Sequence, residues 1–369
     1  MVEGFLPPMK PTCINITSGT HTYPIHIAKG LISRLSSLVD ETAPKGRRFI
    51  VSNSTIWRIH GQIISTALPD AEIILIPDGE RFKTLHTVGR IYESLIRAGA
   101  DRQATLVAVG GGVVGDVAGF AAATFLRGIS ILHVPTTLLG QVDSAIGGKV
   151  GVNHTLGKNL IGAFYPPTSV LIDPELLTTL PRREFRAGLY EIIKYGMIAS
   201  RDLFERVERE LSALFNYDQP SLQTIITECC RIKGSIVETD EREAGLRRIL
   251  NFGHTIGHAI EAVTKYRRLK HGEAVGYGML AAADIAERRR KLAPAARKAL
   301  SALIIQLGPM PSVADLSSKQ VIDAINRDKK VREGKLHFVL PSSIGVVTIV
   351  DDVTTRQINA ALRRLGLRP

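Results

Sequence analysis

Short apolar runs rich in β-branched residues alternate with helix-forming segments through the first half of this chain, and this alternation restricts the fold more than any other feature. Each run is bounded by turn residues, which is typical of buried strands joined by helical crossovers. The pattern predicts an α/β domain built on a parallel sheet. The expected strands are Arg48–Val51, Ala71–Ile76, Thr105–Val109, Ile129–Val134 and Ser169–Ile172, with a further edge strand at Tyr23–Ile27 that could form a hairpin.

The pattern changes after Pro181, where Ala, Leu, Glu and Arg recur at the spacing of long amphipathic helices. Two later apolar runs, Lys335–Leu340 and Gly345–Val350, predict a small hairpin before a terminal helix. A chain of 369 residues is long enough for two hydrophobic cores. We therefore expect an α/β domain over residues 1–181 and a mainly α-helical domain over residues 182–369.

Composition indicates an ordinary globular protein, with 44% hydrophobic and 22% charged residues. Three cysteines, Cys13, Cys229 and Cys230, cannot form a disulfide framework for a chain of this size, so reduced thiols are expected. No secretory signal is visible among the first residues. The most apolar window, Leu106–Leu126, contains a glycine triplet and Asp116, which argues against a membrane span. We expect a soluble, cytoplasmic protein.

The formal net charge of +12 is compatible with two kinds of partner, nucleic acid or an anionic small molecule. The basic residues are scattered, and no stacking aromatic residues are interleaved with them. The one dense run, Arg288–Lys291, is typical of a solvated helix face. Charge alone does not decide between the two partners; the motifs described next do.

A glycine-rich segment follows one of the expected strands directly. Leu106–Val109 leads into Gly110-Gly111-Gly112-Val113-Val114-Gly115-Asp116, and a helix-compatible run comes next. Gly110, Gly112 and Gly115 match G-x-G-x-x-G, in which glycines let the backbone approach a pyrophosphate at a helix N-terminus. A tight strand-to-helix turn that binds no ligand would produce the same glycine pattern. The strand and helix on either side favour a nucleotide site in a Rossmann-like sheet.

The carboxylate that usually binds ribose about 20 residues after such a turn is absent, because Phe120–Ser130 holds no acidic residue. The segment Asp78–Lys83 instead follows an earlier strand, and its carboxylates and lysine are candidates for a ribose and a phosphate. A charged surface turn is the alternative. Thr136 and Thr137 follow another expected strand, at the edge of the sheet where open α/β folds bind ligands.

Three histidines occur close together in the second half of the chain. His254 and His258 are four residues apart, hence on one helical face, and His271 follows soon after. This pattern suits zinc or a similar divalent ion. A catalytic zinc takes three protein ligands, so a carboxylate from elsewhere could be the third donor. Glu191 is a candidate, because it pairs with Lys194 in an apolar helical stretch where charge is costly. Ordinary hydrogen-bonded helix histidines are the alternative.

A group of basic and polar residues suits an anion. Lys149 and Lys158 lie in glycine-rich loops, which make a poor core and a good anion cradle. Arg247 precedes Asn251 by four residues, so both are expected on one helical face leading to the histidines. Such groups would bind a phosphate and a carboxylate together. For Lys233, a surface salt bridge with neighbouring acids is the simpler interpretation.

These motifs closely resemble the 3-dehydroquinate synthase family, and they occur in the order and spacing of that family. The resemblance covers most of the chain from Asp78 to about Leu340. The stretches that carry it are Gly110–Phe120 (GGGVVGDVAGF), Val134–Asn153 (VPTTLLGQVDSAIGGKVGVN), Gly157–Ala163 (GKNLIGA), Gly188–Gly196 (GLYEIIKYG), Asn251–Glu261 (NFGHTIGHAIE) and His271–Val275 (HGEAV).

The resemblance implies an NAD-binding α/β domain, a helical domain, and an active site in the cleft between them. It implies that Glu191, His254 and His271 bind a divalent metal, zinc or possibly cobalt. The implied substrate contacts and catalytic residues are Asp143, Lys149, Asn159, Lys194, Lys233, Arg247, Asn251 and His258. The implied NAD contacts are Asp78, Gly79, Glu80, Arg81, Phe82, Lys83, Gly112, Val113, Val114, Gly115, Asp116, Thr136, Thr137, Lys149, Lys158, Leu176, Leu177, Thr178 and Thr179.

The resemblance also implies a homodimer, in which Arg127 of the partner subunit reaches the substrate phosphate. A further phosphate contact near the C-terminus falls on Lys335 or His337. The chain departs from the family at Asn53, where many members have aspartate, and at Tyr195, which replaces a common histidine. An extension at the N-terminus is a third difference. None of these changes touches a proposed catalytic group.

The implied reaction converts a phosphorylated sugar acid, 3-deoxy-D-arabino-heptulosonate 7-phosphate, to 3-dehydroquinate and inorganic phosphate in the shikimate pathway. NAD would be reduced and reoxidised within one turnover. A metal-dependent polyol dehydrogenase is one alternative, but it would release NADH and leave the anion-binding residues without a ligand. Another sugar-phosphate cyclase, whose substrate lacks the carboxylate, is a second. A non-enzymatic anion-binding or nucleic-acid-binding module is a third, and it would leave the histidine cluster without a purpose.

Overall fold

The structure, a computed structural model, describes residues 11–331 and 336–369. The chain forms two compact units, and each is described by itself. The first unit consists of two segments, the chain up to Leu180 and the later segment Ala213–Glu241. The second unit consists of Pro181–Ser212 and Arg242–Pro369. The expected boundary near residue 181 coincides with the end of the first segment. The return of Ala213–Glu241 to the first unit was not expected, because helical periodicity does not tell which core a helix packs against.

The first unit is built on one sheet in the order β1-β2-β9-β6-β5-β3-β4. Every strand pair is parallel except β1–β2, which forms an antiparallel hairpin at the edge. The predicted parallel sheet and edge hairpin are both confirmed. The strands are β1 (Thr12–Ser18), β2 (His21–Ile27), β3 (Arg48–Asn53), β4 (Glu72–Ile76), β5 (Thr105–Gly110), β6 (Ser130–Pro135) and β9 (Ser169–Ile172).

The strand order creates a switch point between β3 and β5. The chain leaves β3 toward β4 on one side and then crosses to β5 on the other side. The connections that leave the carboxyl ends of β3 and β5 therefore run in opposite directions along the sheet. Open α/β sheets bind ligands in the crevice formed between two such connections. The glycine-rich turn that was singled out in the sequence follows β5 at this point.

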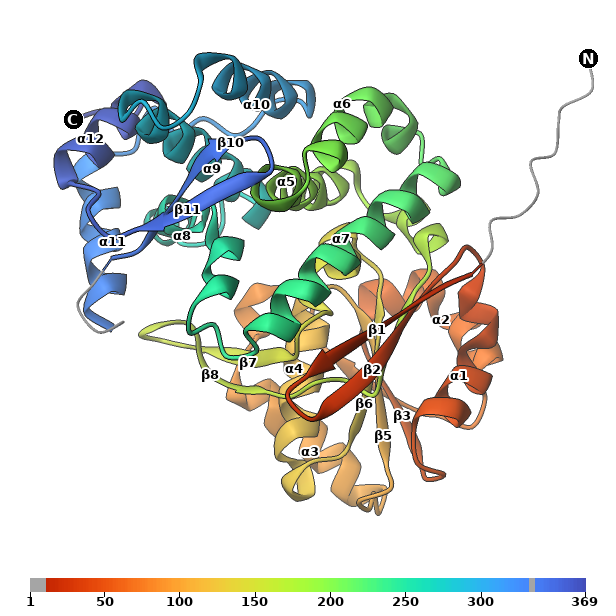
Figure 1. Ribbon diagram of the computed structural model, residues 1–369. Helices are drawn as coiled ribbons and strands as arrows, with labels where there is room; N and C mark the ends of the chain where they lie inside the picture. The colour runs from red at the N-terminus through yellow and green to blue at the C-terminus, as the bar shows by residue number, and fades with distance from the viewer. Residues whose placement is uncertain (1–10, 332–335) are drawn as a thin grey trace, which may run out of the picture. The chain divides into compact units, whose positions relative to one another are not determined.

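Helices cover both faces of the sheet (Figure 1). Residues of β5 alternate between two cores, with Leu106 packed on one face and Val107 on the other. Helices α1 (Leu35–Thr42) and α2 (Ser54–Ala67) contribute to the core around Val107, and α3 (Leu85–Arg97) and α4 (Gly112–Thr124) to the core around Leu106. Burial on both faces explains why β5 reads as a continuous apolar run.

Two further strands were not expected. β7 (Lys149–His154) and β8 (Gly157–Phe164) form an antiparallel hairpin that packs against α4. The prediction of glycine-rich loops around Lys149 and Lys158 was therefore wrong. The glycines mark a close approach of two backbones, because a Cβ at Gly151 would lie 2.6 Å from the carbonyl oxygen of Ile161.

Helix α7 (Gln219–Thr239) returns to the first unit and packs against β1 and the π-helical turn η4 (Gly140–Ser144). A Cβ at Gly234 would lie 2.9 Å from Ile16, so the helix lies close to the edge hairpin. Glu238 accepts a hydrogen bond from the backbone of Thr17. This packing places Lys233 of α7 beside η4.

The second unit is mainly helical, as predicted, with one small hairpin before the last helix. Its central helix, α9, packs against α5, α8, α10, α12 and β10. The elements are α5 (Arg182–Ala199), α6 (Arg201–Phe215, whose last turn belongs to the first unit), η6 (Leu246–Asn251), α8 (His254–Val263), α9 (His271–Arg288), α10 (Pro294–Gln306), α11 (Ser318–Val331), β10 (Phe338–Ser343), β11 (Val346–Val350) and α12 (Thr355–Arg364). Among the helices of the described residues, none has the length and apolar character needed to cross a bilayer.

Helices α5 and α9 approach each other very closely at one glycine. A Cβ at Gly272 would lie 2.0 Å from the backbone oxygen of Ala187, which no side chain would tolerate without a shift. Gly272 adjoins His271, and Ala187 lies one helical turn before Glu191. This contact therefore sets the spacing between two of the proposed metal ligands.

Candidate active-site residues in the two units

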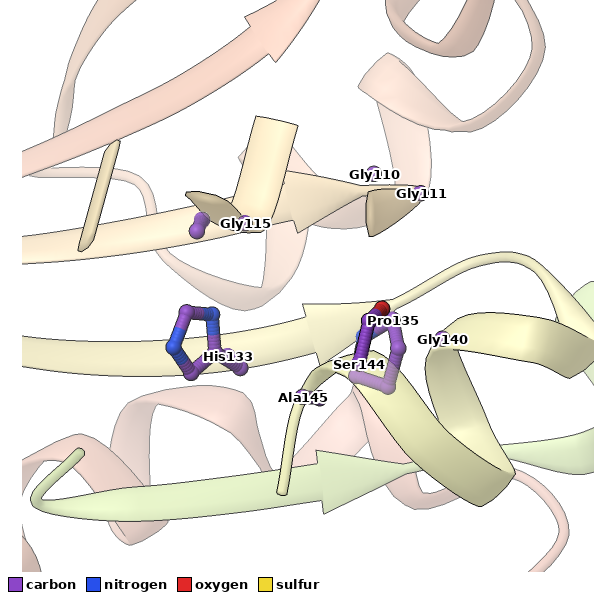
Figure 2. Close-up of a pocket in the computed structure, with 9 residues that line it drawn as sticks. Gly110, Gly111, Gly115, His133, Pro135, Gly140, Ser144 and Ala145 are labelled. Carbon is purple, nitrogen blue, oxygen red and sulfur yellow. The ribbon is translucent and has the colours of Figure 1, made fainter. Parts of the chain in front are cut away.

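The glycine turn of the first unit presents free backbone amides at the start of a helix. Helix α4 begins at Gly112, and its first intrahelical bond runs from the Gly115 N–H to the Gly111 carbonyl at 3.1 Å. The preceding amides, on Gly112, Val113 and Val114, have no partner within the helix, which makes them donors for an anion. The turn lines a pocket (Figure 2) together with His133, Pro135, Gly140, Ser144 and Ala145.

The loop after β6 is tied to the glycine turn. The Thr136 N–H donates to the Gly110 carbonyl at 3.0 Å, and Thr137 Oγ1 accepts from the Gly140 N–H at 3.0 Å. The Thr136 hydroxyl is buried and has no hydrogen-bond partner among the residues that the structure describes. The amides at the start of α4, the buried Thr136 hydroxyl and the glycines, which let a ligand approach the backbone, together suit the pyrophosphate of a dinucleotide.

The loop after β4 carries Lys83, which is 5% exposed and contacts two other candidate residues. Its Nζ ion-pairs with Asp116 on α4 and donates to Asn159 Oδ1 on β8 at 2.5 Å. Burial raises the pKa of Asp116, and the charge of Lys83 opposes that rise. The structure thus brings together one residue from each of three sequence motifs.

Asn153 of β7 connects the same loop to the hairpin, although the sequence analysis assigned it no role beyond membership of the Val134–Asn153 motif. Its backbone N–H donates to the Lys83 carbonyl at 2.8 Å, and its Nδ2 donates to Glu80 Oε1 at 2.8 Å. Its Oδ1 accepts from the Asn159 N–H at 3.0 Å. Lys158 Nζ lies 3.6 Å from the same Glu80 oxygen.

Asn53 makes a definite contact at the position where an aspartate was the family expectation. Its Nδ2 donates to Asp78 Oδ1 at 3.1 Å, and its Oδ1 accepts the Ile56 N–H as the N-cap of α2. Gly79 follows with a φ of 106°, and the Arg81 guanidinium lies over the Phe82 ring at 4.6 Å from its centroid. The contact between Asn53 and Asp78 ties this loop to the carboxyl end of β3.

The proposed contacts at Leu176–Thr179 fall in the short 3₁₀ helix η5 (Pro174–Thr179). Leu176 and Leu177 are 5% and 0% exposed, so their side chains belong to the core and only their backbone is available to a ligand. The Thr178 hydroxyl donates to the Glu175 carbonyl at 2.7 Å, and Thr179 Oγ1 lies 2.9 Å from His60 Nε2. The contact of Thr179 with His60 ties η5 to helix α2.

Lys233 forms a buried pair with Asp143. The lysine is 6% exposed, and its Nζ donates to both the carbonyl and Oδ1 of Asp143 at 2.6 Å. The prediction of a surface salt bridge with acids near Lys233 in sequence was wrong, because α7 packs onto η4 and turns this lysine inward. Lys149, at the start of β7, is exposed.

Arg127 lies away from the glycine turn of its own unit. It occupies η3 (Phe125–Arg127) at the far end of α4 from the glycine turn, with a φ of 70°. Helix α4 has 13 residues, which corresponds to about 20 Å. The chain does not bring Arg127 to its own glycine turn, so its proposed contact to phosphate depends on a second subunit.

In the second unit, Glu191 lies opposite two imidazoles. Its side chain is 0% exposed, and Oε1 lies 3.8 Å from His254 Nε2 and 3.6 Å from His271 Nε2. Oε1 accepts no hydrogen bond from the described part of the chain. The other oxygen, Oε2, ion-pairs with Lys194 Nζ at 2.5 Å. The structure therefore brings close together Glu191, His254 and His271, the three residues that the sequence analysis named as metal ligands.

These distances fit a shared ion better than hydrogen bonds. Nitrogen and oxygen atoms bonded tetrahedrally to zinc at about 2.1 Å are about 3.4 Å apart. Separations of 3.6 and 3.8 Å are close to that value and too long for hydrogen bonds. A buried carboxylate oxygen that faces two ring nitrogens in this way is a natural metal ligand.

His258 completes a cluster of three imidazoles. The ligand-capable atoms of His254, His258 and His271 all lie within 4.8 Å of one another, and the His254 and His258 rings meet edge to face at 5.2 Å. Burial, followed by the charge of Lys194 and the nearby imidazoles, holds the pKa of His254 well below its usual range. A neutral His254 ring is the form that binds a metal.

Asn251 and Arg247 belong to the 3₁₀ helix η6, not to an α-helix. With three residues per turn, positions four apart do not share a face, so the expected common face of Arg247 and Asn251 was wrong. Arg247 is buried, at 1% exposure. Asn251 Nδ2 donates to Glu243 Oε1 at 2.6 Å, and Glu243 has a φ of 60°. The sequence analysis did not identify Glu243.

Three remaining residues lie near the C-terminus or on α8. Lys335 lies outside the described residues, and His337 is partly buried just before β10. Glu261, which the sequence analysis assigned no role, is buried on α8 with Oε2 3.3 Å from His271 Nδ1. A signal for it was present, because His254, His258 and Glu261 follow the i, i+4, i+7 spacing of one helical face.

Comparison with known proteins assigns both halves of the chain to one family. Residues 73–187 match the model of the 3-dehydroquinate synthase N-terminal region, and residues 188–331 match that of its C-terminal region. A 3-dehydroquinate synthase from Nostoc sp. strain PCC 7120 is 46% identical over 360 residues, covering 95% of this chain and 99% of that protein.

Solved structures of sugar-phosphate cyclases have the same fold. The 2-epi-5-epi-valiolone synthase ValA of Streptomyces hygroscopicus subsp. jinggangensis, with NAD⁺ and Zn²⁺ bound, is 30% identical, with a TM-score of 0.86 and coverage of 93% of this chain and 96% of that one. A 2-deoxy-scyllo-inosose synthase with carbaglucose-6-phosphate, NAD⁺ and Co²⁺ is 30% identical, with a TM-score of 0.85 and coverage of 96% and 100%. Because a relative at 46% identity and both family models account for most of its length, the chain belongs to the 3-dehydroquinate synthase family.

Proposed function

We propose that this chain converts 3-deoxy-D-arabino-heptulosonate 7-phosphate to 3-dehydroquinate and inorganic phosphate, the 3-dehydroquinate synthase reaction of the shikimate pathway. In reaction class it is a carbon–oxygen lyase that acts on phosphate. The observation that carries this proposal is the 46% identity to a 3-dehydroquinate synthase along 95% of the chain. The site chemistry is consistent with it, because each unit supplies residues suited to one of the two groups that the reaction needs.

The proposed cofactors are NAD and one divalent metal ion, zinc or cobalt, as found in the solved cyclases. NAD supplies a reversible hydride acceptor, and the metal supplies a Lewis acid that acidifies a substrate hydroxyl. The amides of Gly112–Val114 would hold the pyrophosphate of NAD, with Asp78–Lys83, Thr136 and Thr179 around it. Glu191, His254 and His271 would hold the metal.

The remaining polar residues are proposed to hold the substrate and move its protons. Lys149, Lys233 and Arg247 would provide cations for the carboxylate and the phosphate. Lys233 and Arg247 are buried, where less screening by water strengthens the attraction. Asn159 and Lys194 would orient hydroxyls. His258 would accept or return a proton, with Asn251 and Glu243 held beside each other at 2.6 Å. Arg127 is proposed to act from the partner subunit of a homodimer.

A proposed cytoplasmic location agrees with the cysteines. Cys13, Cys229 and Cys230 form no disulfide, and burial raises the pKa of Cys230 to about 12, which makes that one thiol a poor nucleophile. Reduced thiols are normal in a reducing compartment.

The proposed function is tested by measuring phosphate release from the heptulosonate phosphate while following absorbance at 340 nm. We expect stoichiometric phosphate without accumulation of NADH, loss of activity with a chelator, and recovery with Zn²⁺ or Co²⁺. Net NADH production from a simple polyol, without phosphate release, would instead identify a dehydrogenase.

A second candidate is another sugar-phosphate cyclase, since the two solved cyclases share 30% identity with this chain. The two candidates differ in whether the substrate carries a carboxylate. Assays with glucose 6-phosphate and sedoheptulose 7-phosphate, which lack it, separate them. Turnover of either at a rate equal to that of the heptulosonate phosphate would favour the second candidate.

A further inference from the structure

Glu261 is a buried acidic residue that the proposed reaction does not use. Its side chain is about 4% exposed, on a face of α8 that it shares with His254 and His258. Removing a carboxylate from water costs several kcal/mol unless a partner compensates for it. A carboxylate in this position therefore calls for a definite partner.

That partner is the ring of His271 on the neighbouring helix α9. Glu261 Oε2 lies 3.3 Å from His271 Nδ1, at the long end of the hydrogen-bonding range. The other ring nitrogen, Nε2, faces Glu191 Oε1 at 3.6 Å. The His271 ring therefore lies between two carboxylates, one on each nitrogen.

The chemistry of the two partners decides where the ring proton resides. A carboxylate can only accept, so Glu261 favours the tautomer with the proton on Nδ1. The lone pair is then on Nε2, which faces the proposed metal position. Metal-binding histidines usually donate their other N–H to a carboxylate or a carbonyl in this way, which fixes the ring and makes it a stronger ligand.

His254 shows the same arrangement with a different acceptor. Its Nδ1 lies 3.1 Å from the backbone carbonyl of Phe252, and its Nε2 faces Glu191. The orientation of the His254 ring is thus set by a backbone carbonyl two residues earlier in the chain. The orientation of His271 depends on a side chain from another helix, which can be removed by substitution.

We propose that Glu261 is a positioning residue of the metal centre, which holds His271 in the Nδ1–H tautomer and so presents Nε2 to the ion. In this role Glu261 acts through His271, on the ring nitrogen opposite the one that faces Glu191. The proposal rests on the proposed metal site of Glu191, His254 and His271. It adds a role for the carboxylate that contacts the far side of the His271 ring.

The test measures metal binding to the metal-free, full-length protein and does not depend on activity. Glu261→Met removes the charge and the acceptor, whereas Glu261→Gln keeps an acceptor without the charge. Asp284→Asn is the matched control, because Asp284 is also a buried acid (6% exposed) on α9 but pairs with Arg364 and Arg288. Zinc affinity is measured by competition with a chromophoric chelator, and the site geometry by the visible spectrum of bound Co²⁺.

We expect Glu261→Met to lower zinc affinity about 10-fold to 100-fold and to change the Co²⁺ spectrum, with a smaller loss in Glu261→Gln. Asp284→Asn should bind zinc within about twofold of the wild type, even if it unfolds at a lower temperature. Wild-type affinity in Glu261→Met, or an equal loss in Asp284→Asn, would overturn the proposal. If Glu261→Met does not fold, Glu261→Gln carries the same comparison, and an unchanged affinity there counts against the proposal.

The same measurements separate this inference from the proposed metal site itself. A wild-type protein that binds neither Zn²⁺ nor Co²⁺ at one ion per chain would contradict the metal site. Tight binding by the wild type together with undiminished binding by Glu261→Met would contradict only the role of Glu261.

Discussion

Lys233 of α7 donates to both the carbonyl and the carboxylate of Asp143 in the π-helical turn η4, at 2.6 Å in each case. The two residues are 90 positions apart, and both side chains are at least three-quarters buried. The pair fixes α7 to the turn that follows β6. It also keeps a cation close to the pocket of the glycine turn.

Removing this lysine should destabilise the first unit. Lys233→Met leaves the Asp143 carboxylate without its cation, and we expect the free energy of unfolding to fall by about 3 kcal/mol in urea titrations. The double variant with Asp143→Leu should lose less than the sum of the single losses. Lys29→Met, which breaks an exposed pair with Glu175, is the control and should change stability by less than about 0.5 kcal/mol. Strict additivity in the double variant would show that the two side chains are not coupled.

The metal ligands can be distinguished from the third imidazole. His258 lies in the same cluster as His254 and His271, but the distances from Glu191 Oε1 define a site made by the other two histidines. We expect His271→Ala and Glu191→Gln to lose zinc and metal-dependent turnover while NAD binding, measured by calorimetry, stays intact. His258→Asn should retain zinc and lose activity. Loss of zinc in His258→Asn equal to that in His271→Ala would move the ligand assignment to the three histidines.

We expect that position 272 accommodates no side chain, because α5 and α9 approach each other too closely there. In Gly272→Ala the new methyl group meets the Ala187 carbonyl, so α5 and α9 must separate near Glu191 and His271. We expect a loss of about 1–3 kcal/mol in stability and weaker zinc binding. Gly89→Ala on α3 is the control, since a Cβ there meets nothing within 4 Å. That variant should be neutral or more stable by up to about 1 kcal/mol. Equal effects in the two variants would refute the role of the contact.

His133 should make stability depend on pH. Its ring lies in the pocket under the glycine turn (Figure 2), and burial lowers its pKa to about 4. Between pH 6.5 and pH 4 the unfolded chain binds a proton at this residue and the folded chain does not, so stability falls as the pH falls through this window. We expect the wild type to lose about 2 kcal/mol from this group between pH 7.5 and pH 5.

The comparison with His133→Gln isolates that contribution, because the other histidines are common to both proteins. Urea unfolding at pH 7.5 and pH 5 should show a shallower pH dependence in the variant by about 2 kcal/mol. Parallel pH profiles for the two proteins would mean that His133 is protonated in the folded state.

The architecture of the first unit follows largely from local patterns. Runs such as Thr105–Val109 read as strands because both of their faces are buried in a parallel sheet, and burial on both faces produces an unbroken apolar run. The hairpin of β7 and β8 escaped the same reasoning. Its glycines resemble those of a loop, and the close backbone contact that explains them forms only when Gly151 and Gly162 face each other across the hairpin.

The sequence by itself determined the strand-to-helix glycine turn, the pair of histidines on one helical face, and Glu191 as a charge in an apolar helix, because each of these depends on neighbours a few residues away. Only the tertiary structure decided that Lys233 is buried against Asp143, that Glu261 lies behind His271, and that α7 packs with the first unit. Hydrophobic periodicity reports that a face is buried and not what it is buried against. The partner of a buried charge is chosen by the packing of distant elements, and it appears only when those elements are placed together.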